Sequence, residues 1–190
     1  MVKKTLKYGL FLCVLGIIVG VLLSVVNAIT KPIIEEQENE KVQSMLKEYN
    51  DTYAWSENVS NNYSNLDNDI QAIYIGRENG LDKVYVYQVK GLGYGNGEIV
   101  SMVYIENDVV SKVSIVSASG QTKGVGTNAL EEEFLTNAYV GNSVVNYCYI
   151  KATEHSNKEV DVLSGATYTS RGVLSSVIVA CKHYNSEVTR

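Results

Sequence analysis

Paired cysteines, clusters of basic residues and metal-ligand spacings are scarce or absent in this chain, and each absence excludes a class of protein. Its three cysteines, Cys13, Cys148 and Cys181, form no CxxC pair, so neither a zinc knuckle nor a disulfide framework is indicated. Lysine and arginine number 16 against 21 acidic residues, and the net charge is −5. Nucleic-acid binding depends on clustered cations, so nucleic acid is not expected as a partner. No metal site is expected either.

What the chain does contain is enough apolar material for one folded domain. It has 190 residues, of which 45% are hydrophobic and 19% are charged, and 14 of its 17 aromatic residues are tyrosines. This composition is typical of a folding chain rather than a disordered one. The length allows one ordinary domain and an appendage.

The appendage is an apolar segment near the amino terminus. Between Lys7 and Lys31 there is no charged residue, and residues 8–29 form a run of 22 that spans about 33 Å as a helix, enough to cross a bilayer core of about 30 Å. A cleaved signal peptide is the competing interpretation, since lysines also precede such signals. The run is longer than the apolar core of a typical signal, which favours a retained transmembrane anchor.

The lysines on one side of this segment predict its orientation. Lys3, Lys4 and Lys7 precede it, whereas mainly glutamates follow it. The positive-inside rule therefore places residues 1–7 in the cytoplasm and everything after the span outside the cytoplasmic membrane. In that compartment a disulfide between Cys148 and Cys181 is chemically permitted, although no spacing in the sequence indicates one.

Residues 30–69 are predicted to form a stalk helix followed by an irregular segment. Thr30 is placed to cap a new helix that has Pro32 in its first turn and acidic residues directly after it. Apolar residues then recur at helical spacing as far as Tyr49. From residue 50 to 69 the chain is rich in Asn, Ser and Asp and shows no clear period.

Residues 70–190 have the pattern of an α+β domain with an antiparallel sheet and flanking helices. Four segments rich in β-branched and aromatic residues are separated by short turns, which predicts strands joined as a meander. These strands are expected at residues 70–75, 83–89, 99–105 and 109–117. Helices are expected at residues 129–135 and 173–181, and a further strand at residues 144–150.

A dense cluster of hydroxyl groups and a glycine precedes the last predicted helix. The cluster and its nearest acid are Asp161, Ser164, Gly165, Ala166, Thr167, Tyr168, Thr169 and Ser170. Free N–H groups and the positive end of the helix dipole would make this a phosphate cradle. Serine and threonine are also ordinary helix caps, and the residues by themselves leave both interpretations open.

The string from Ser164 to Ser170, with Asp161 upstream, resembles the flavinylation motif of a known family. It is similar to the FMN-binding domains of the G subunit of Rnf electron-transport complexes and of the C subunit of the sodium-pumping NADH:quinone reductase. The resemblance implies that a flavin transferase using FAD joins FMN through its phosphate to Thr167, which would make the chain a phosphoprotein. The other cluster residues would then surround this cofactor.

A second stretch extends the resemblance. Residues 121–126 are similar to the family's Glu-Thr-Pro-Gly-Leu-Gly turn, which lies against the flavin, and they would supply Thr122, Gly124 and Gly126 to the site. Gln121 stands where the family usually has Glu, and Lys123 where it has Pro. The glycine-rich residues 91–97 also resemble a family segment, but they lack the GxGxxG spacing of a dinucleotide fold.

The function that the resemblance implies is electron transfer without a catalytic side chain. The chain would be a membrane-anchored subunit that relays electrons through FMN beside other membrane subunits of an ion-translocating complex, rather than a self-sufficient enzyme. Three alternatives stay open. These are the quinone-reductase C subunit, a stand-alone surface flavoprotein, and a cofactor-free membrane-tethered binding module whose hydroxyl cluster is only a helix cap.

Overall fold

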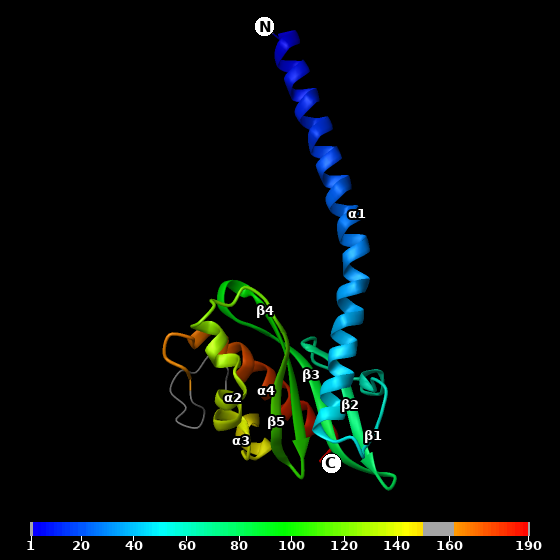
Figure 1. The fold of residues 1–190 in the computed structure, drawn as a ribbon, viewed down its shortest axis with the longest axis vertical. Coiled ribbons are helices and arrows are strands. Elements are labelled where there is room, and N and C mark those ends of the chain that lie inside the picture. Colours follow the sequence, from blue (N-terminus) through cyan, green and yellow to red (C-terminus); the bar gives the residue numbers. More distant parts are fainter. Residues whose placement is uncertain (1, 150–161, 190) are drawn as a thin grey trace. The chain divides into compact units, whose positions relative to one another are not determined.

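The computed structural model describes residues 2–149 and 162–189 of the chain. The fold divides into two compact units, Met1–Met45 and Leu46–Arg190 (Figure 1). Its elements follow one another as a long helix, a meander of strands, and a group of helices. An antiparallel sheet with flanking helices was the expected class of fold, and it is confirmed.

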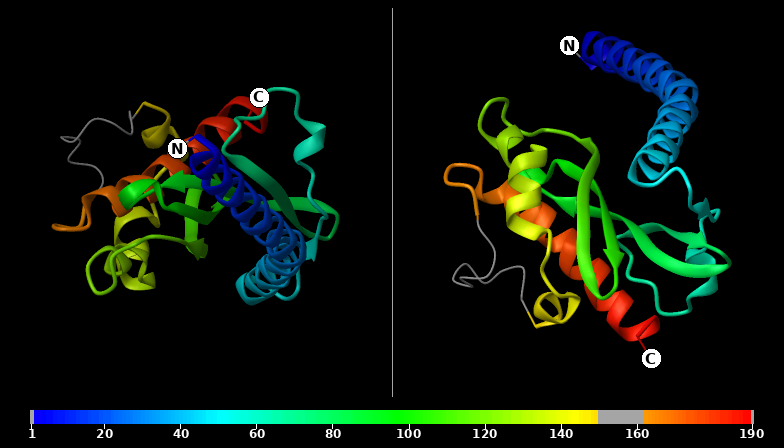
Figure 2. Two further views of the ribbon diagram at one scale, coloured as in Figure 1. Left: turned by 90° about the horizontal axis from the view of Figure 1, so that it is seen from above. Right: turned by 60° about the horizontal axis from the view of Figure 1, so that its bottom comes forward.

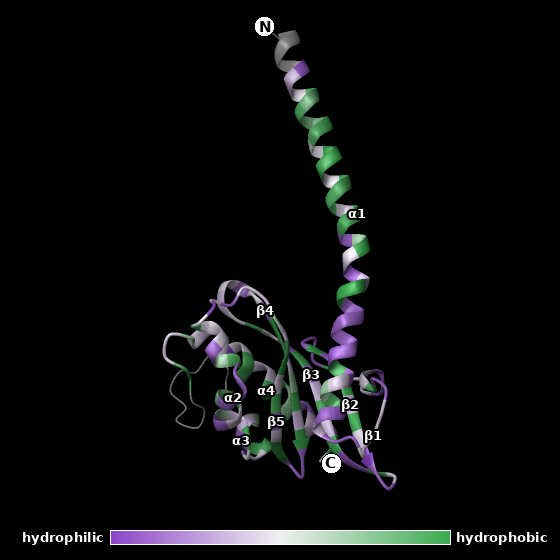
Figure 3. Ribbon diagram, in the orientation of Figure 1, coloured by the Kyte–Doolittle hydropathy of each residue, from purple (hydrophilic) through white to green (hydrophobic). Residues whose placement is uncertain are grey.

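Helix α1 (Val2–Tyr49) contains the predicted membrane segment. Its 48 residues make it about 72 Å long, and its colouring changes from hydrophobic to hydrophilic along its length (Figure 3). The large apolar side chains between Tyr8 and Ile29 are all exposed. In the described part of the chain, α1 is the one helix long and apolar enough to cross a membrane, as a single-pass anchor would.

The predicted helix start at Thr30 is wrong, because α1 continues through it. Thr30 does not cap a helix; its hydroxyl donates to the carbonyl oxygen of Val26 at 2.5 Å, one turn back. Pro32 lies inside the helix, where its missing N–H leaves one carbonyl without its usual bond. A helix start signal such as Thr30 separates two helices only when the first helix has already ended. Glycine is the usual residue at a helix end, and none stands between Gly20 and Pro32.

The sheet has five strands in the order in which they occur along the chain, each antiparallel to its neighbours. The strands are β1 (Ala54–Trp55), β2 (Ile70–Glu78), β3 (Leu81–Leu92), β4 (Glu98–Glu106) and β5 (Val109–Ala118). All four predicted strands are present and somewhat longer than expected. Tight turns with positive φ at Asn79 and Gly80, and at Asn107 and Asp108, join the two long hairpins. Strand β1 was not predicted.

The remaining elements are short 3₁₀ turns and three helices. They are η1 (Ser60–Asn62), η2 (Tyr94–Asn96), η3 (Gly126–Leu130), α2 (Glu132–Tyr139), α3 (Val144–Cys148) and α4 (Thr167–Glu187). The predicted closing helix is confirmed and extends further in both directions. The predicted helix at 129–135 is divided between η3 and α2.

The predicted strand at 144–150 is wrong, since residues 144–148 form helix α3. Val144 and Tyr147, three residues apart, are both buried, as one face of a helix requires. The Val144 N–H donates to the carbonyl of Asp108 at 2.9 Å, which fixes the start of this segment beside the β4–β5 turn. Tertiary packing has overridden the strand preference of its two valines.

Helix α4 covers one face of the sheet, and the main core lies between them (Figure 2). Tyr87 and Val89 of β3 pair with Val103 and Ser101 of β4, so these residues point to the same face. The largest buried side chains on the sheet side of this core are Tyr87, Ile73, Ile99 and Ile105. Those of α4 include Val173, Val177, Ala180 and Cys181.

Two glycines bring α4 and β3 into backbone contact. A Cβ atom at Gly91 would lie 2.1 Å from the carbonyl oxygen of Gly172, and one at Gly172 would lie 2.8 Å from the carbonyl oxygen of Leu92. No side chain can be added at either position without moving backbone. The first turns of α4 are therefore held at a fixed depth against the end of β3.

We expect Gly91→Ala to lower the free energy of unfolding by about 3 kcal/mol, because the new methyl group meets a backbone carbonyl that cannot rotate away. The measurement is denaturant unfolding of the full-length protein in detergent. Gly141→Asn is the control: a Cβ atom there meets nothing within 4 Å, and only the positive φ of 86° is opposed. A cost of about 1 kcal/mol is expected for it. Equal losses for the two variants would contradict the contact.

The second face of the sheet carries a smaller aromatic cluster. Tyr49, at the end of α1, stacks on Tyr104 of β4 with ring centroids 4.7 Å apart, and its ring edge meets Trp55. The Tyr49 hydroxyl donates to the Glu106 carboxylate at 2.7 Å. Burial is the main reason why the pKa of Tyr49 rises to about 12. This cluster joins the residues around Leu46 to the sheet.

Ionisation of Tyr49 predicts a loss of stability at alkaline pH. Its pKa is about 12 in the folded chain and near 10 when unfolded, so the unfolded chain releases its proton first. The stabilisation of the folded chain by protonated Tyr49 is fully present below pH 10 and is lost as the pH rises toward 12. Thermal unfolding between pH 8 and 12 should therefore show a shallower decline for Tyr49→Phe than for the wild type. Tyr149→Phe, at an exposed position, is the control and should follow the wild-type curve. A Tyr49→Phe curve parallel to the wild-type curve would contradict the contribution of Tyr49 to the alkaline loss of stability.

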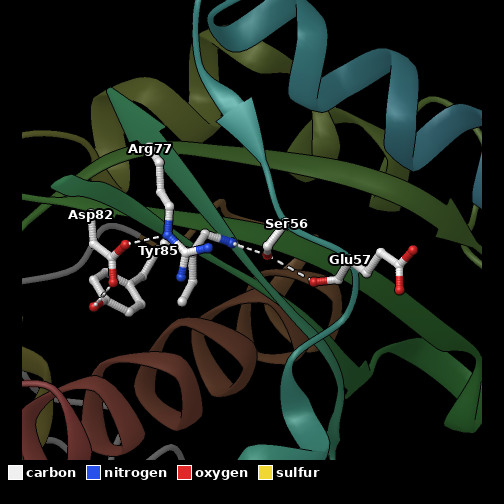
Figure 4. A network of polar contacts seen from close by, with 6 residues as sticks. Ser56, Glu57, Arg77, Asp82 and Tyr85 are labelled. Atoms are coloured by element: carbon white, nitrogen blue, oxygen red, sulfur yellow. Dashed lines mark hydrogen bonds and ion pairs between the residues drawn. The ribbon is translucent and has the colours of Figure 1, made fainter. Parts of the chain in front are cut away.

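A polar network fastens the segment after β1 and the tip of the β2–β3 hairpin (Figure 4). The Arg77 Nε donates to an Asp82 oxygen at 2.6 Å, and the Tyr85 hydroxyl donates to the other oxygen at 3.2 Å. Ser56 accepts the Ile75 N–H at 2.9 Å. These bonds order the edge of the sheet.

Cys148 and Cys181 are neighbours in the fold but are free thiols in the structure. The Cys148 thiol donates to the carbonyl oxygen of Cys181, with the sulfur 3.7 Å from it. Burial raises the pKa of both thiols.

Candidate functional site

Three segments that are distant in the sequence meet at one end of the sheet and line a cavity of about 160 Å³. They are the connection between β3 and β4, the turn after β5, and the start of α4. The lining residues are Tyr94, Thr122, Val125, Gly126, Gly165, Ala166, Tyr168 and Thr169. Six of these were predicted from the sequence.

The other predicted residues are placed around this cavity rather than in its wall. Thr167 begins α4, Ser164 is exposed in the preceding turn, and Ser170 is buried one turn into the helix. Gly124 occupies the turn after β5 with a φ of 76°. Asp161 lies outside the described residues.

Two lining residues, Tyr94 and Val125, were not predicted. Tyr94 lies inside the glycine-rich residues 91–97. Its place among these glycines was the signal that could have identified it as a site residue. Val125 stands between two of the predicted residues of the turn and gave no separate signal. Both are about half exposed, at 55% and 44%.

The amino terminus of α4 has no side-chain cap. Its N-cap residue is Ala166, and the first helical hydrogen bond runs from the Ser170 N–H to the Ala166 carbonyl at 2.9 Å. Within residues 2–149 and 162–189, the N–H groups of Thr167, Tyr168 and Thr169 have no acceptor. The cap interpretation of the hydroxyl cluster therefore does not hold. Three free N–H groups at the positive end of a 21-residue helix form a site suited to an anion.

The hydroxyls of the cluster differ in how they are used. The Thr169 hydroxyl is 1% exposed and donates to the Gln121 side-chain oxygen at 2.7 Å. The Ser170 hydroxyl is equally buried and donates to the Ala166 carbonyl at 3.1 Å. Thr167 is half-buried and Ser164 exposed, and neither side chain has a hydrogen bond to the described part of the chain. Among the three aliphatic hydroxyls in the first turn of α4, the one on Thr167 is thus the uncommitted one.

Glycines keep the turn after β5 close to α4. A Cβ atom at Gly126 would lie 3.0 Å from the Thr169 hydroxyl oxygen. At Gly124 nothing lies within 4 Å, so its backbone is open to an approaching ligand. Gly165, with a φ of 84°, allows the sharp turn before the helix.

The rim of the cavity is aromatic and includes a cation, Arg171. The rings of Tyr94 and Tyr168 meet edge to face with centroids 6.2 Å apart. The guanidinium carbon of Arg171 lies 5.9 Å from the centroid of Tyr168. Flat conjugated groups pack well on such a surface, and a phosphate is attracted to the adjacent helix end.

The comparison with known families explains this combination. Residues 93–182 match the FMN-binding domain, and every lining residue of the cavity falls within that range. The fold and site therefore define a flavin-binding protein. Residues 1–48 match the RnfG N-terminal region. Together the two matches support an RnfG-like FMN-binding subunit, a family that implies membership of an Rnf complex with other subunits. No curated protein matches it.

The residues present fit FMN. The free N–H groups of α4 suit its phosphate, and Tyr94, Val125 and Tyr168 offer apolar surface to its ring. A cavity of about 160 Å³ is smaller than the 300 Å³ or more typical of whole-ligand pockets, so part of the cofactor would lie on the exposed rim.

Proposed function

We propose that the Thr167 hydroxyl carries FMN as a phosphoester, and that the chain relays electrons through it in an Rnf-type complex. The observation that carries this proposal is the position of Thr167. Thr167 is the first residue of the uncapped helix α4 and lies beside the cavity of an FMN-binding domain. Its hydroxyl is uncommitted.

Attachment is a phosphoryl transfer that a flavin transferase using FAD performs. The Thr167 Oγ forms a bond to the phosphorus of the FMN half, the bond between the two phosphates breaks, and AMP leaves. The hydroxyl proton is released. The free N–H groups of α4 would stabilise the phosphoryl oxygens, since anions are favoured at that end of a helix.

The protein's part after attachment is positioning. A bound flavin supplies the electron-accepting and electron-donating chemistry. Tyr94 and Tyr168 would hold the ring at the surface, and the helix end would hold the phosphate. An exposed ring is accessible to electron partners, so the chain needs no catalytic side chain of its own. Ion translocation, of sodium or protons, would belong to other subunits.

The membrane arrangement completes the proposal. Residues 1–7 would be cytoplasmic and residues 8–29 would span the membrane. Residues 30–69 would connect this span to the FMN-binding domain at 70–190, which would lie outside the cytoplasmic membrane. The RnfG-type region at residues 1–48 favours an Rnf-type subunit over the quinone-reductase C subunit or a stand-alone flavoprotein.

The attachment is tested on a denaturing gel under ultraviolet light, with the full-length chain co-expressed with a flavin transferase. We expect a fluorescent band for the wild type and none for Thr167→Ala, because the other two aliphatic hydroxyls in the first turn of α4, those of Thr169 and Ser170, are buried and hydrogen-bonded. Thr167→Ser should restore the band, since it restores a hydroxyl at that place.

Ser164→Ala is the matched control, because Ser164 also has an uncommitted hydroxyl but lies outside the helix. It should fluoresce like the wild type. A dark wild-type band beside a fluorescent control substrate of the same transferase would refute covalent attachment. A bright Thr167→Ala band together with a dark Ser164→Ala band would move the acceptor to Ser164.

The orientation is tested by adding protease to membrane vesicles. In right-side-out vesicles the protease should remove the FMN-binding domain and leave a short membrane fragment. In inside-out vesicles the domain should be protected. A cytoplasmic marker enclosed in the right-side-out vesicles should stay intact, which shows that they are sealed. The reverse pattern of protection would overturn the proposed orientation.

A further inference from the structure

Gln121 joins all three segments that build the flavin site. Its side-chain oxygen accepts the Thr169 hydroxyl at 2.7 Å and the Tyr94 backbone N–H at 3.2 Å. Its side-chain nitrogen donates to the Ser119 carbonyl oxygen at 2.7 Å. One amide thus connects the first turn of α4, the connection between β3 and β4, and the end of β5.

Two glycines, Gly93 and Gly97, leave room for this amide. A Cβ atom at Gly93 would lie 2.6 Å from the Gln121 side-chain oxygen, and one at Gly97 would lie 2.9 Å from its nitrogen. The neighbouring backbone is therefore packed around this particular side chain, and its position is closely defined.

The partners of Gln121 match a neutral amide. A primary amide satisfies all three partners, because its oxygen accepts from the two donors and its nitrogen donates to the carbonyl. A carboxylate would accept from the two donors but would face the Ser119 carbonyl without a proton between the oxygens. An apolar side chain would satisfy none of the three and would leave the buried Thr169 hydroxyl without its acceptor.

We propose that Gln121 is the positioning residue of the flavin site, acting through Thr169 and Tyr94. By holding Thr169 it fixes the turn that presents Thr167 to the transferase, and it keeps the Thr169 hydroxyl engaged. Because its amide is neutral, it also adds no negative charge next to the cavity wall, where reduction of a flavin adds electrons. This inference rests on the proposed attachment of FMN at Thr167.

The first test measures how fast Thr167 is modified. The full-length chain with Gln121→Met, of similar size but without the amide, is incubated with the transferase and FAD. We expect its initial rate to fall about tenfold, since the bond that holds Thr169 in the acceptor turn and the two bonds that hold Gln121 in place are lost. Gln88→Met is the matched control, because Gln88 is a buried glutamine of β3 that bonds Gln71 and Tyr74 instead. It should be modified at the wild-type rate.

A second variant keeps the test valid if Gln121→Met unfolds. Thr169→Val removes the same hydrogen bond from its other partner with little change of shape. It should slow the modification of Thr167 as well. In the double variant the two effects should not add, because both remove one interaction.

The third measurement is the midpoint potential of the attached flavin. Gln121→Glu keeps two of the hydrogen bonds and adds a negative charge, so the flavin should become harder to reduce and its potential more negative than in the wild type. A purely structural role of Gln121 would leave the potential of the modified protein unchanged.

The outcomes separate this inference from the proposed function. Wild-type rates for Gln121→Met and Thr169→Val, or an unchanged potential for Gln121→Glu, would overturn the role of Gln121 while leaving the attachment at Thr167 intact. Absence of flavin from the wild-type chain would overturn the proposed function, and this inference with it.

Discussion

The contact between the backbones of Gly91 and Gly172 is the constraint on which the site depends. Each residue lacks the Cβ atom that would hold α4 away from β3, so the helix lies at one fixed depth on the sheet. Its amino terminus is five residues from this contact, at Thr167. The same contact therefore places the uncapped helix end beside the turn after β5. A shift of the helix would separate Thr169 from Gln121 and open the cavity.

Local sequence patterns predicted the sheet well because its strands are local features. β-branched and aromatic residues and the Asn-Gly turn at 79–80 define β2 and β3 without reference to the rest of the fold. Three elements were missed or misjudged, and two of them depend on distant residues. Strand β1 forms because it pairs with β2, and α3 begins where the Val144 N–H bonds the Asp108 carbonyl. Helix α1 continues through Thr30 because no stop signal precedes that residue.

The candidate site was predicted as a set of residues but not as an arrangement. The string around Thr167 and the turn at 121–126 carried the resemblance, and the structure brings Thr122, Gly126 and Thr169 to one cavity. Sequence spacing could not distinguish the Thr167 and Thr169 hydroxyls. The difference lies in a hydrogen bond to Gln121, 48 residues away along the chain, which no local pattern encodes. Tyr94 was missed for the same reason.

The charge of the chain gives a physical reason for a covalent cofactor. Three of the 16 cationic residues precede the apolar segment and none of the 21 acidic ones do, so residues 31–190 carry 13 − 21 = −8. Reversible binding of free FMN, with its phosphate of nearly two negative charges, is opposed by such a surface. Under the proposed linkage the phosphate becomes a diester with about one charge, which the free N–H groups of α4 suit. Occupancy then no longer depends on the affinity of an acidic domain for an anion, and a small cavity suffices.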